Sequence, residues 1–166
     1  MSTICSAPRL TRYKRWADEL IFQAVRALPE GEATKERPTL FKTMLHTLNH
    51  IYVVDLVWQA HLEGRKHGIS ALNVILHENV EDLWRAQQAA DEWYVALSDS
   101  LSEPALREIV EFEFIDGKPG RMSRGDILLH VVNHTTYHRG WVADLFFQVP
   151  ARPPTTDFPV FLRTEE

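Results

Sequence analysis

The histidine-bearing stretch at residues 125–149, GDILLHVVNHTTYHRGWVADLFFQV, constrains the fold more than any other part of the chain. Apolar residues and two histidines recur in it at spacings of 4, 3, 4, 4, 3 and 4. At roughly 100° per residue these positions form a strip about 80° wide. The strip consists of Ile127, Val131, His134, His138, Val142, Leu145 and Val149. This periodicity predicts a long amphipathic helix that packs the strip against other helices.

His134 and His138 occupy the middle of that strip, where leucine or isoleucine would be the ordinary choice. Residues four apart on a helix point the same way, about 6 Å apart along the axis, so the two imidazoles could share one metal ion. The alternative is a pair of core histidines that hydrogen bonds satisfy, because a buried imidazole without a partner is costly. His130 lies one turn earlier, at the edge of the strip.

Composition narrows the class of protein. The 166 residues fit a single domain, residues 1–166, and 45% of them are hydrophobic and 25% charged. The net charge is −5 and no Lys/Arg-rich block occurs, which argues against nucleic-acid binding.

No run approaches the ~18 apolar residues of a membrane span, and the first thirty residues lack a signal-peptide core. A single cysteine, Cys5, in a short polar tail fits a reducing compartment. We therefore expect a cytoplasmic protein that does not enter a membrane.

Three further helices are predicted upstream. The first covers about residues 9–28 and ends before Pro29 and Gly31. The second covers about residues 39–62, with Pro38 suited to its first turn, and the third about residues 80–99. Residues 108–123 alternate in polarity around a strong turn signal, which predicts a small hairpin. The chain is therefore predicted to be all-α, a four-helix bundle with long crossover connections plus a small β-hairpin before the last long helix.

The second helix carries apolar residues on two sides and is expected to lie between other helices. It offers His46, His50 and His61 as a possible third metal ligand, and periodicity does not choose among them. Asp55, in the middle of a stripe, needs a partner if it is buried. We expect a backbone group or a helix terminus in that role; the alternative is a ligand histidine that Asp55 orients.

Three segments together resemble the DinB family of metal-binding four-helix bundles. They are TLNHIYVVD at residues 47–55, NHTTYHRG at residues 133–140 and PPTTD at residues 153–157. The resemblance covers nearly the whole chain, and the second segment is its most specific part. It implies that His50, His134 and His138 hold a divalent metal, usually zinc or nickel. Where the family commonly has Gln after Arg-Gly, this chain has Trp141.

Three imidazoles would leave at least one coordination position open, as in catalytic rather than closed structural sites. Related branches of the superfamily resemble transferases and isomerases that use a low-molecular-weight thiol. The first hypothesis is therefore a metal-dependent enzyme, a thiol S-transferase or a hydrolase, acting on a small-molecule thiol or electrophile. The second is a non-catalytic metalloprotein or interaction module, and the third is a metal-free domain with satisfied core histidines.

The residues assign no catalytic acid or base, and three imidazoles alone suit zinc, nickel, copper or iron about equally. Tyr137 and Arg139 flank the histidine pair and are both expected to point away from the centre of the strip. Arg139 is predicted to lie on the surface or in a dimer interface, since homodimers are common in the resembling family.

Overall fold

The computed structural model describes residues 6–165, so Cys5 lies outside the described residues. Four long helices dominate the fold: α1 (Ala7–Arg26), α2 (Met44–Leu62), α3 (Val80–Ser100) and α5 (Arg124–Leu145). The remaining elements are α4 (Glu103–Leu106), β1 (Ile109–Glu113), β2 (Pro119–Ser123), the 3₁₀ turn η1 (Phe146–Gln148) and α6 (Phe158–Leu162).

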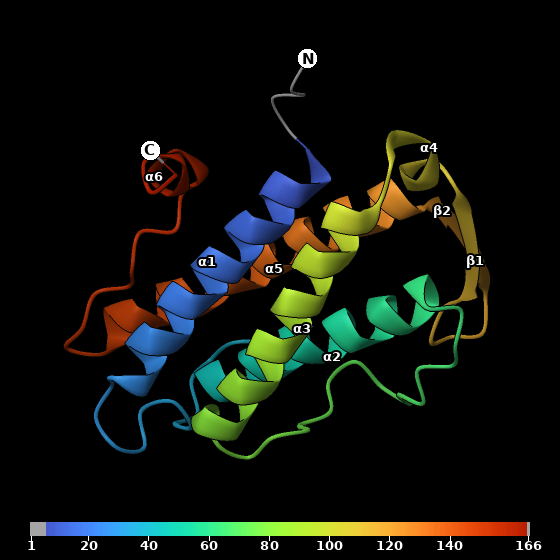
Figure 1. Ribbon diagram of the computed structural model, residues 1–166. Helices are drawn as coiled ribbons and strands as arrows, with labels where there is room; N and C mark the ends of the chain where they lie inside the picture. The colour runs from blue at the N-terminus through green and yellow to red at the C-terminus, as the bar shows by residue number, and fades with distance from the viewer. Residues whose placement is uncertain (1–5, 166) are drawn as a thin grey trace.

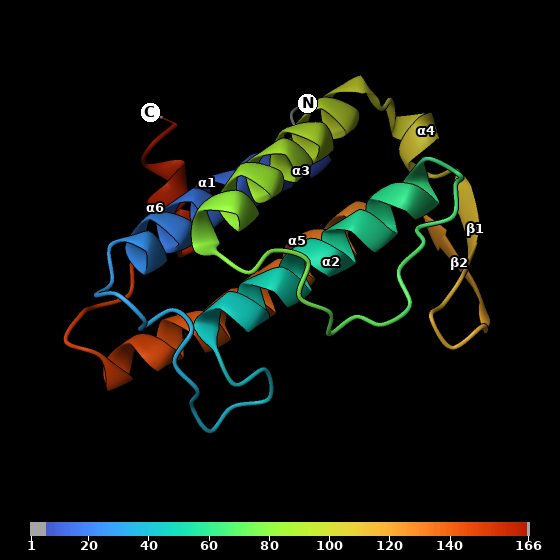
Figure 2. The same cartoon turned by 90° about the horizontal axis from the view of Figure 1, so that it is seen from below.

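The four long helices form two layers, with α1 beside α3 and α2 beside α5 (Figures 1 and 2). Contacts between α1 and α5 and between α2 and α3 close the bundle. The connection at residues 63–79 runs back along α2, so α2 and α3 point in the same direction (Figure 2). This arrangement confirms the predicted four-helix bundle with a long crossover connection.

The hairpin lies at the end of the bundle where α5 begins (Figure 1). Its strands pair antiparallel, with Ile109 opposite Ser123 and Phe112 opposite Gly120. Ser123 ends β2 and also caps α5, because its hydroxyl accepts a hydrogen bond from the Asp126 backbone N–H at 3.0 Å. The hairpin therefore sets the start of the helix that carries the histidine pair.

Two element boundaries differ from the predicted ones by more than two residues, and one short helix was not predicted. The second helix begins at Met44 rather than near residue 39, because Lys42 has a left-handed φ of 62° and Thr43 forms the cap. The last long helix ends at Leu145, and η1 follows it rather than a further α-helical turn. Residues 103–106 form the unpredicted short helix α4.

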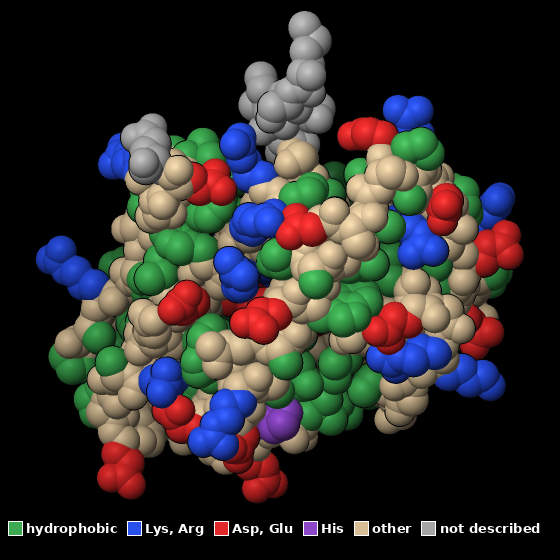
Figure 3. All heavy atoms as spheres, in the orientation of Figure 1, with side chains coloured by type: hydrophobic (Ala, Val, Ile, Leu, Met, Phe, Trp, Pro, Cys, Tyr) green, Lys and Arg blue, Asp and Glu red, His purple; other side chains and the backbone are tan. Residues whose placement is uncertain are grey.

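The core consists of apolar side chains from all four long helices. One cluster joins Phe22, Leu48, Trp84 and Val142, and a second joins Trp58, Tyr94, Ile127 and Val131. On the outside, acidic and basic side chains are interspersed over α1 and α3 (Figure 3). Within the described residues, every helix is too short or too polar to cross a membrane.

Candidate metal centre

Three histidines converge between α2 and α5. His50 comes from α2, and His134 and His138 come from one face of α5. One nitrogen of each ring lies within 4.8 Å of one nitrogen of each of the other two. The Nε2 atoms of His50 and His134 are 3.1 Å apart, and the His50 and His138 ring centroids are 4.5 Å apart. These are the residues that the family resemblance selected.

The connection at residues 63–79 fixes the orientation of His50. The Nδ1 atom of His50 lies 2.8 Å from the Leu72 carbonyl oxygen, which can only accept a hydrogen bond. Nδ1 therefore carries the proton, and the lone pair of Nε2 faces His134. A backbone carbonyl commonly orients a metal-binding histidine in this way.

The donor set fits a transition metal better than it fits satisfied core histidines. The Nδ1 atoms of His134 and His138 are buried without a hydrogen-bond partner among the described residues, so these two rings are not fully satisfied core histidines. Two nitrogens bound to one tetrahedral zinc ion at ~2.0–2.1 Å lie about 3.3 Å apart. The 3.1 Å between His50 and His134 is close to that value.

The electrostatics keep all three rings neutral at pH 7, which is the form that binds metals. Burial, with His138 and His50 beside it, lowers the pKa of His134 to about 3. Burial, with His50 beside it, lowers the pKa of His138 to about 4. Burial also lowers the pKa of His50, although the hydrogen bond to Leu72 opposes that shift.

Aromatic side chains cover one side of the three histidines. The Phe41 ring stacks on His50 with centroids 4.5 Å apart, and Trp141 lies edge-on to His138 at 4.6 Å. Phe41 and Trp141 also contact each other. Trp141, which replaces the glutamine common in the resembling family, thus packs against a candidate ligand. Tyr137 is 60% exposed, in agreement with its predicted outward direction.

The other histidines of the two helices lie outside the group. His46 bonds the Asn73 carbonyl oxygen at 2.7 Å. His61 and His130 both pack against Trp58, with centroids 5.3 and 4.8 Å away. The periodicity of the second helix left His46, His50 and His61 open, and the fold places only His50 beside the pair on α5.

Asp55 has a partner that sequence reasoning missed. We expected a backbone group, a helix terminus or a ligand histidine, and this expectation was wrong. Its carboxylate accepts from Lys14 Nζ at 2.7 Å and from Gln87 at 2.8 Å. Lys14 also bonds Asp18 at 2.9 Å and Asp91 at 2.5 Å, and all these side chains are buried. A lysine on the first helix thus bonds carboxyl groups from three helices.

The prediction that Arg139 lies on the surface or in a dimer interface was also wrong. Arg139 is 2% exposed. Its guanidinium donates to the Tyr13 hydroxyl at 2.9 Å and to the Thr156 hydroxyl at 3.2 Å, and it lies 3.5 Å from Asp18. Thr156 belongs to the PPTTD segment, so Arg139 and Tyr13 attach that segment to the bundle.

Comparisons with known proteins agree with this architecture. The model of the DinB family matches residues 1–166. The chain is 25% identical over 161 residues to Protein DinB of Bacillus subtilis (strain 168), covering 93% of this chain and 92% of that protein. The crystal structure of a DinB-like protein from Bacillus cereus ATCC 10987 aligns with a TM-score of 0.61 at 18% identity, covering 84% of this chain and 91% of the other. Since the family model spans the whole sequence and the fold agrees with it, this chain belongs to the DinB family.

Proposed function

We propose that this protein binds one divalent transition metal through His50, His134 and His138 and is a metal-dependent enzyme of the thiol S-transferase or hydrolase type. The observation that carries the proposal is the convergence of three neutral imidazoles, whose nitrogens lie within 4.8 Å of one another and of which His134 borders a cleft. Zinc and nickel suit imidazole donors, and we propose one of the two.

The residues around the three histidines cover one side of the proposed metal and leave another side open to a substrate. A metal held by three imidazoles keeps a position open, where it can lower the pKa of water or a thiol or polarise a carbonyl. Leu72 orients His50 through its carbonyl oxygen, while Phe41 and Trp141 exclude solvent from one side. His134 borders the cleft, so a small-molecule substrate would approach from that side.

Metal analysis of the tag-free protein tests the first half of the proposal. We expect one zinc or nickel ion per chain after reconstitution, and His138→Ala should weaken binding roughly 100-fold or more, since loss of an outer partner alone costs ~10–100-fold. His77→Ala is the matched control, because the His77 ring packs against Tyr52 away from the site. Less than stoichiometric metal in the wild type would contradict the proposal.

Measurements of turnover test the second half of the proposal, that the protein is a metal-dependent enzyme. We would compare the metal-free and metal-loaded forms with activated esters and with alkyl halide electrophiles in the presence of several cellular thiols. Metal-dependent turnover that His138→Ala abolishes is the expected result. Stoichiometric metal without turnover would favour the alternative, a metalloprotein in which the ion stabilises the bundle or a surface that recognises a partner.

A further inference from the structure

A cleft of about 700 Å³ opens beside His134. Its walls come from α2, the connection after it, the hairpin and the first half of α5. The lining side chains are Val54, Val57, Trp58, His61, Leu72, Phe114, Ile115, Asp116, Lys118, Pro119, His130 and His134. Small-molecule sites commonly have volumes of about 300–1,000 Å³ and are lined mainly by apolar and aromatic side chains.

The cleft presents almost no net charge to a ligand. Its one acidic and one basic side chain, Asp116 and Lys118, bond each other at 2.5 Å on the hairpin turn. Trp58 forms part of the apolar wall and is 7% exposed. A carboxylate or phosphate in this cleft would find no unpaired cation among the described lining residues, and its desolvation would oppose binding.

Two imidazoles interrupt the apolar wall. His61 and His130 both pack against Trp58, and neither side chain makes a hydrogen bond within residues 6–165. A neutral imidazole offers one donor and one acceptor, so each ring can bond an uncharged polar group of a ligand, such as a hydroxyl, a carbonyl or an amide.

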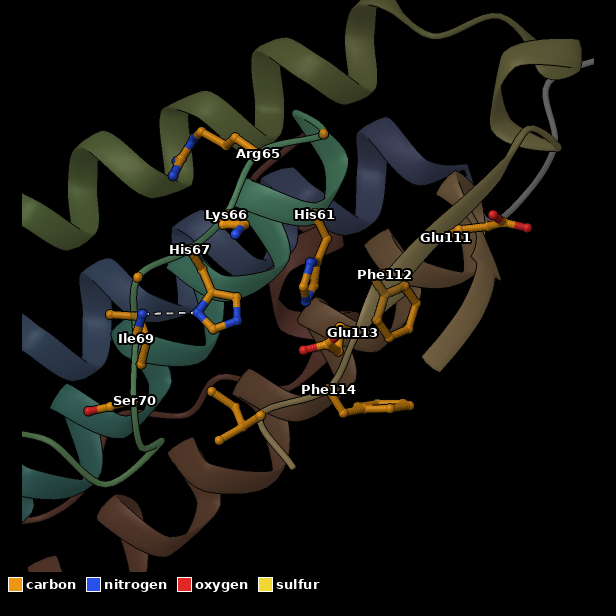
Figure 4. Close-up of a pocket in the computed structure, with 13 residues that line it drawn as sticks. His61, Arg65, Lys66, His67, Ile69, Ser70, Glu111, Phe112, Glu113 and Phe114 are labelled. Atoms are coloured by element: carbon orange, nitrogen blue, oxygen red, sulfur yellow. Dashed lines mark hydrogen bonds between the residues drawn. The ribbon is translucent and has the colours of Figure 1, made fainter. Parts of the chain in front are cut away.

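An adjoining hollow of about 560 Å³ has a different character. It shares His61, Phe114 and Ile115 with the cleft, but its other walls include the charged residues Arg65, Lys66, Glu111 and Glu113. Figure 4 shows His61 and His67 from α2 and its following loop facing Phe112 and Glu113 of β1. None of His50, His134 and His138 borders this hollow, whereas His134 borders the cleft.

We propose that the cleft binds the uncharged, apolar body of the substrate, an aromatic or bulky aliphatic group, and directs its reactive end toward His134. This inference rests on the proposed function for the metal. It deepens that function by assigning to the site an electrophile or ester whose body is apolar and uncharged and whose reactive end meets the metal.

Two hydroxamic acids that share a metal-binding group test the inference on the metal-loaded protein. We would titrate 2-naphthohydroxamic acid and acetohydroxamic acid by calorimetry after measuring the metal content. Burial of the naphthyl group should make the first bind at least about tenfold more tightly than the second. Equal affinities would overturn the inference and leave the metal proposal standing.

A matched pair of substitutions on the hairpin tests whether the preference for the naphthyl compound arises in this cleft. Ile115→Glu places a charge in the cleft and should reduce the naphthyl preference to less than about threefold. Ile109→Glu changes the same residue type on the same hairpin at a position that is 53% exposed and outside the cleft, and should preserve the preference. A preference that Ile115→Glu leaves intact would overturn the assignment to this cleft.

Failure of the metal proposal gives a different result. A wild-type protein that binds no metal would bind neither hydroxamate through its head group. The cleft would then be tested on the metal-free protein with 2-naphthol, by the quenching of tryptophan fluorescence. Saturable binding that Ile115→Glu weakens and Ile109→Glu does not would support the cleft alone, and absence of binding would overturn it.

Discussion

The buried lysine cluster combines more negative than positive charge. Lys14 and Arg139 supply two cations, whereas Asp18, Asp55 and Asp91 supply three carboxyl groups, so protonation of one carboxyl makes the cluster neutral. Burial raises the pKa of Asp91 to about 7, although Lys14 opposes the shift. The Oδ2 atom of Asp91 has no partner among the described residues. Asp91 and Asp55 are therefore the two carboxyls that compete for the proton near neutral pH, because burial raises the pKa of both and each has one oxygen without a partner among the described residues.

Asp91→Asn should change how stability depends on pH. A carboxyl whose pKa is raised from ~3.9 in the unfolded chain to about 7 contributes stability that is fully present below pH ~4 and is lost as pH rises through 7. Asparagine mimics the protonated form at every pH. The free energy of unfolding of the variant should thus rise relative to wild type by up to ~1.4 kcal/mol per pH unit between about pH 4 and 7.

Urea unfolding of both proteins at pH 5, 6, 7 and 8 measures this difference. Asp144→Asn, an exposed position on α5, is the matched control and should show no comparable trend. A stability difference between Asp91→Asn and wild type that stays constant from pH 5 to pH 8 would contradict the raised pKa of Asp91.

The same cluster shows why the burial and the partners of single residues could not be predicted from the sequence. Periodicity classifies a residue by its own polarity, so Arg139 was predicted to be exposed. Its burial depends on Tyr13 and Asp18, which lie more than 120 residues away in the chain. Lys14 likewise depends on Asp91, 77 residues away. Such partners become visible only when the helices are packed together.

At the scale of elements, the hairpin depends on a close approach at Gly120. Gly120 pairs with Phe112 across the sheet, and a Cβ atom at Gly120 would overlap the Phe112 ring and lie 2.9 Å from Phe114. Phe112 cannot move freely, because its ring packs against Trp58 at 4.9 Å and against His61 at 4.9 Å. The glycine thus lets an aromatic side chain join the hairpin to α2.

Gly120→Ala should therefore destabilise the protein by about 1–3 kcal/mol, the usual effect of overpacking. The metal content should stay unchanged, because the hairpin contributes none of the three histidines. Thermal unfolding and metal analysis measure the two quantities. Gly140→Ala is a suitable control, since its added Cβ would meet nothing within 4 Å. Equal stability of the Gly120→Ala variant and wild type would show that Phe112 adjusts without cost.

Element types were easier to predict than element ends. Four apolar periodicities and one alternating segment were sufficient for the helices and the hairpin. The start of α2 was misplaced because Phe41 continues the apolar pattern, whereas its ring actually stacks on His50 from the segment before the helix. The helix α4 has four residues, too few for a periodic signal. Likewise, the spacing on α5 indicated two of the three histidines, and only the family resemblance selected His50.

At the scale of the whole molecule, the three histidines join two helices that the core already holds together. Core clusters flank the site on both sides and include residues of both α2 and α5, such as Leu48 with Val142 and Val54 with Val131. The bundle should therefore fold without metal, and metal should add stability by binding the folded form alone.

Removal of the metal should lower the melting temperature while the helical circular dichroism at 20 °C stays the same. Free metal at about 100 times its Kd stabilises a folded protein by ~2.7 kcal/mol, which for a chain of this size corresponds to roughly 5–10 °C. His138→Ala should melt at one temperature with or without metal, since it leaves two imidazoles to hold the ion. Loss of helical signal on chelation would mean that the ion organises the bundle itself. An identical melting temperature for the chelated and metal-loaded wild type would mean that an ion shared by α2 and α5 does not stabilise the folded protein.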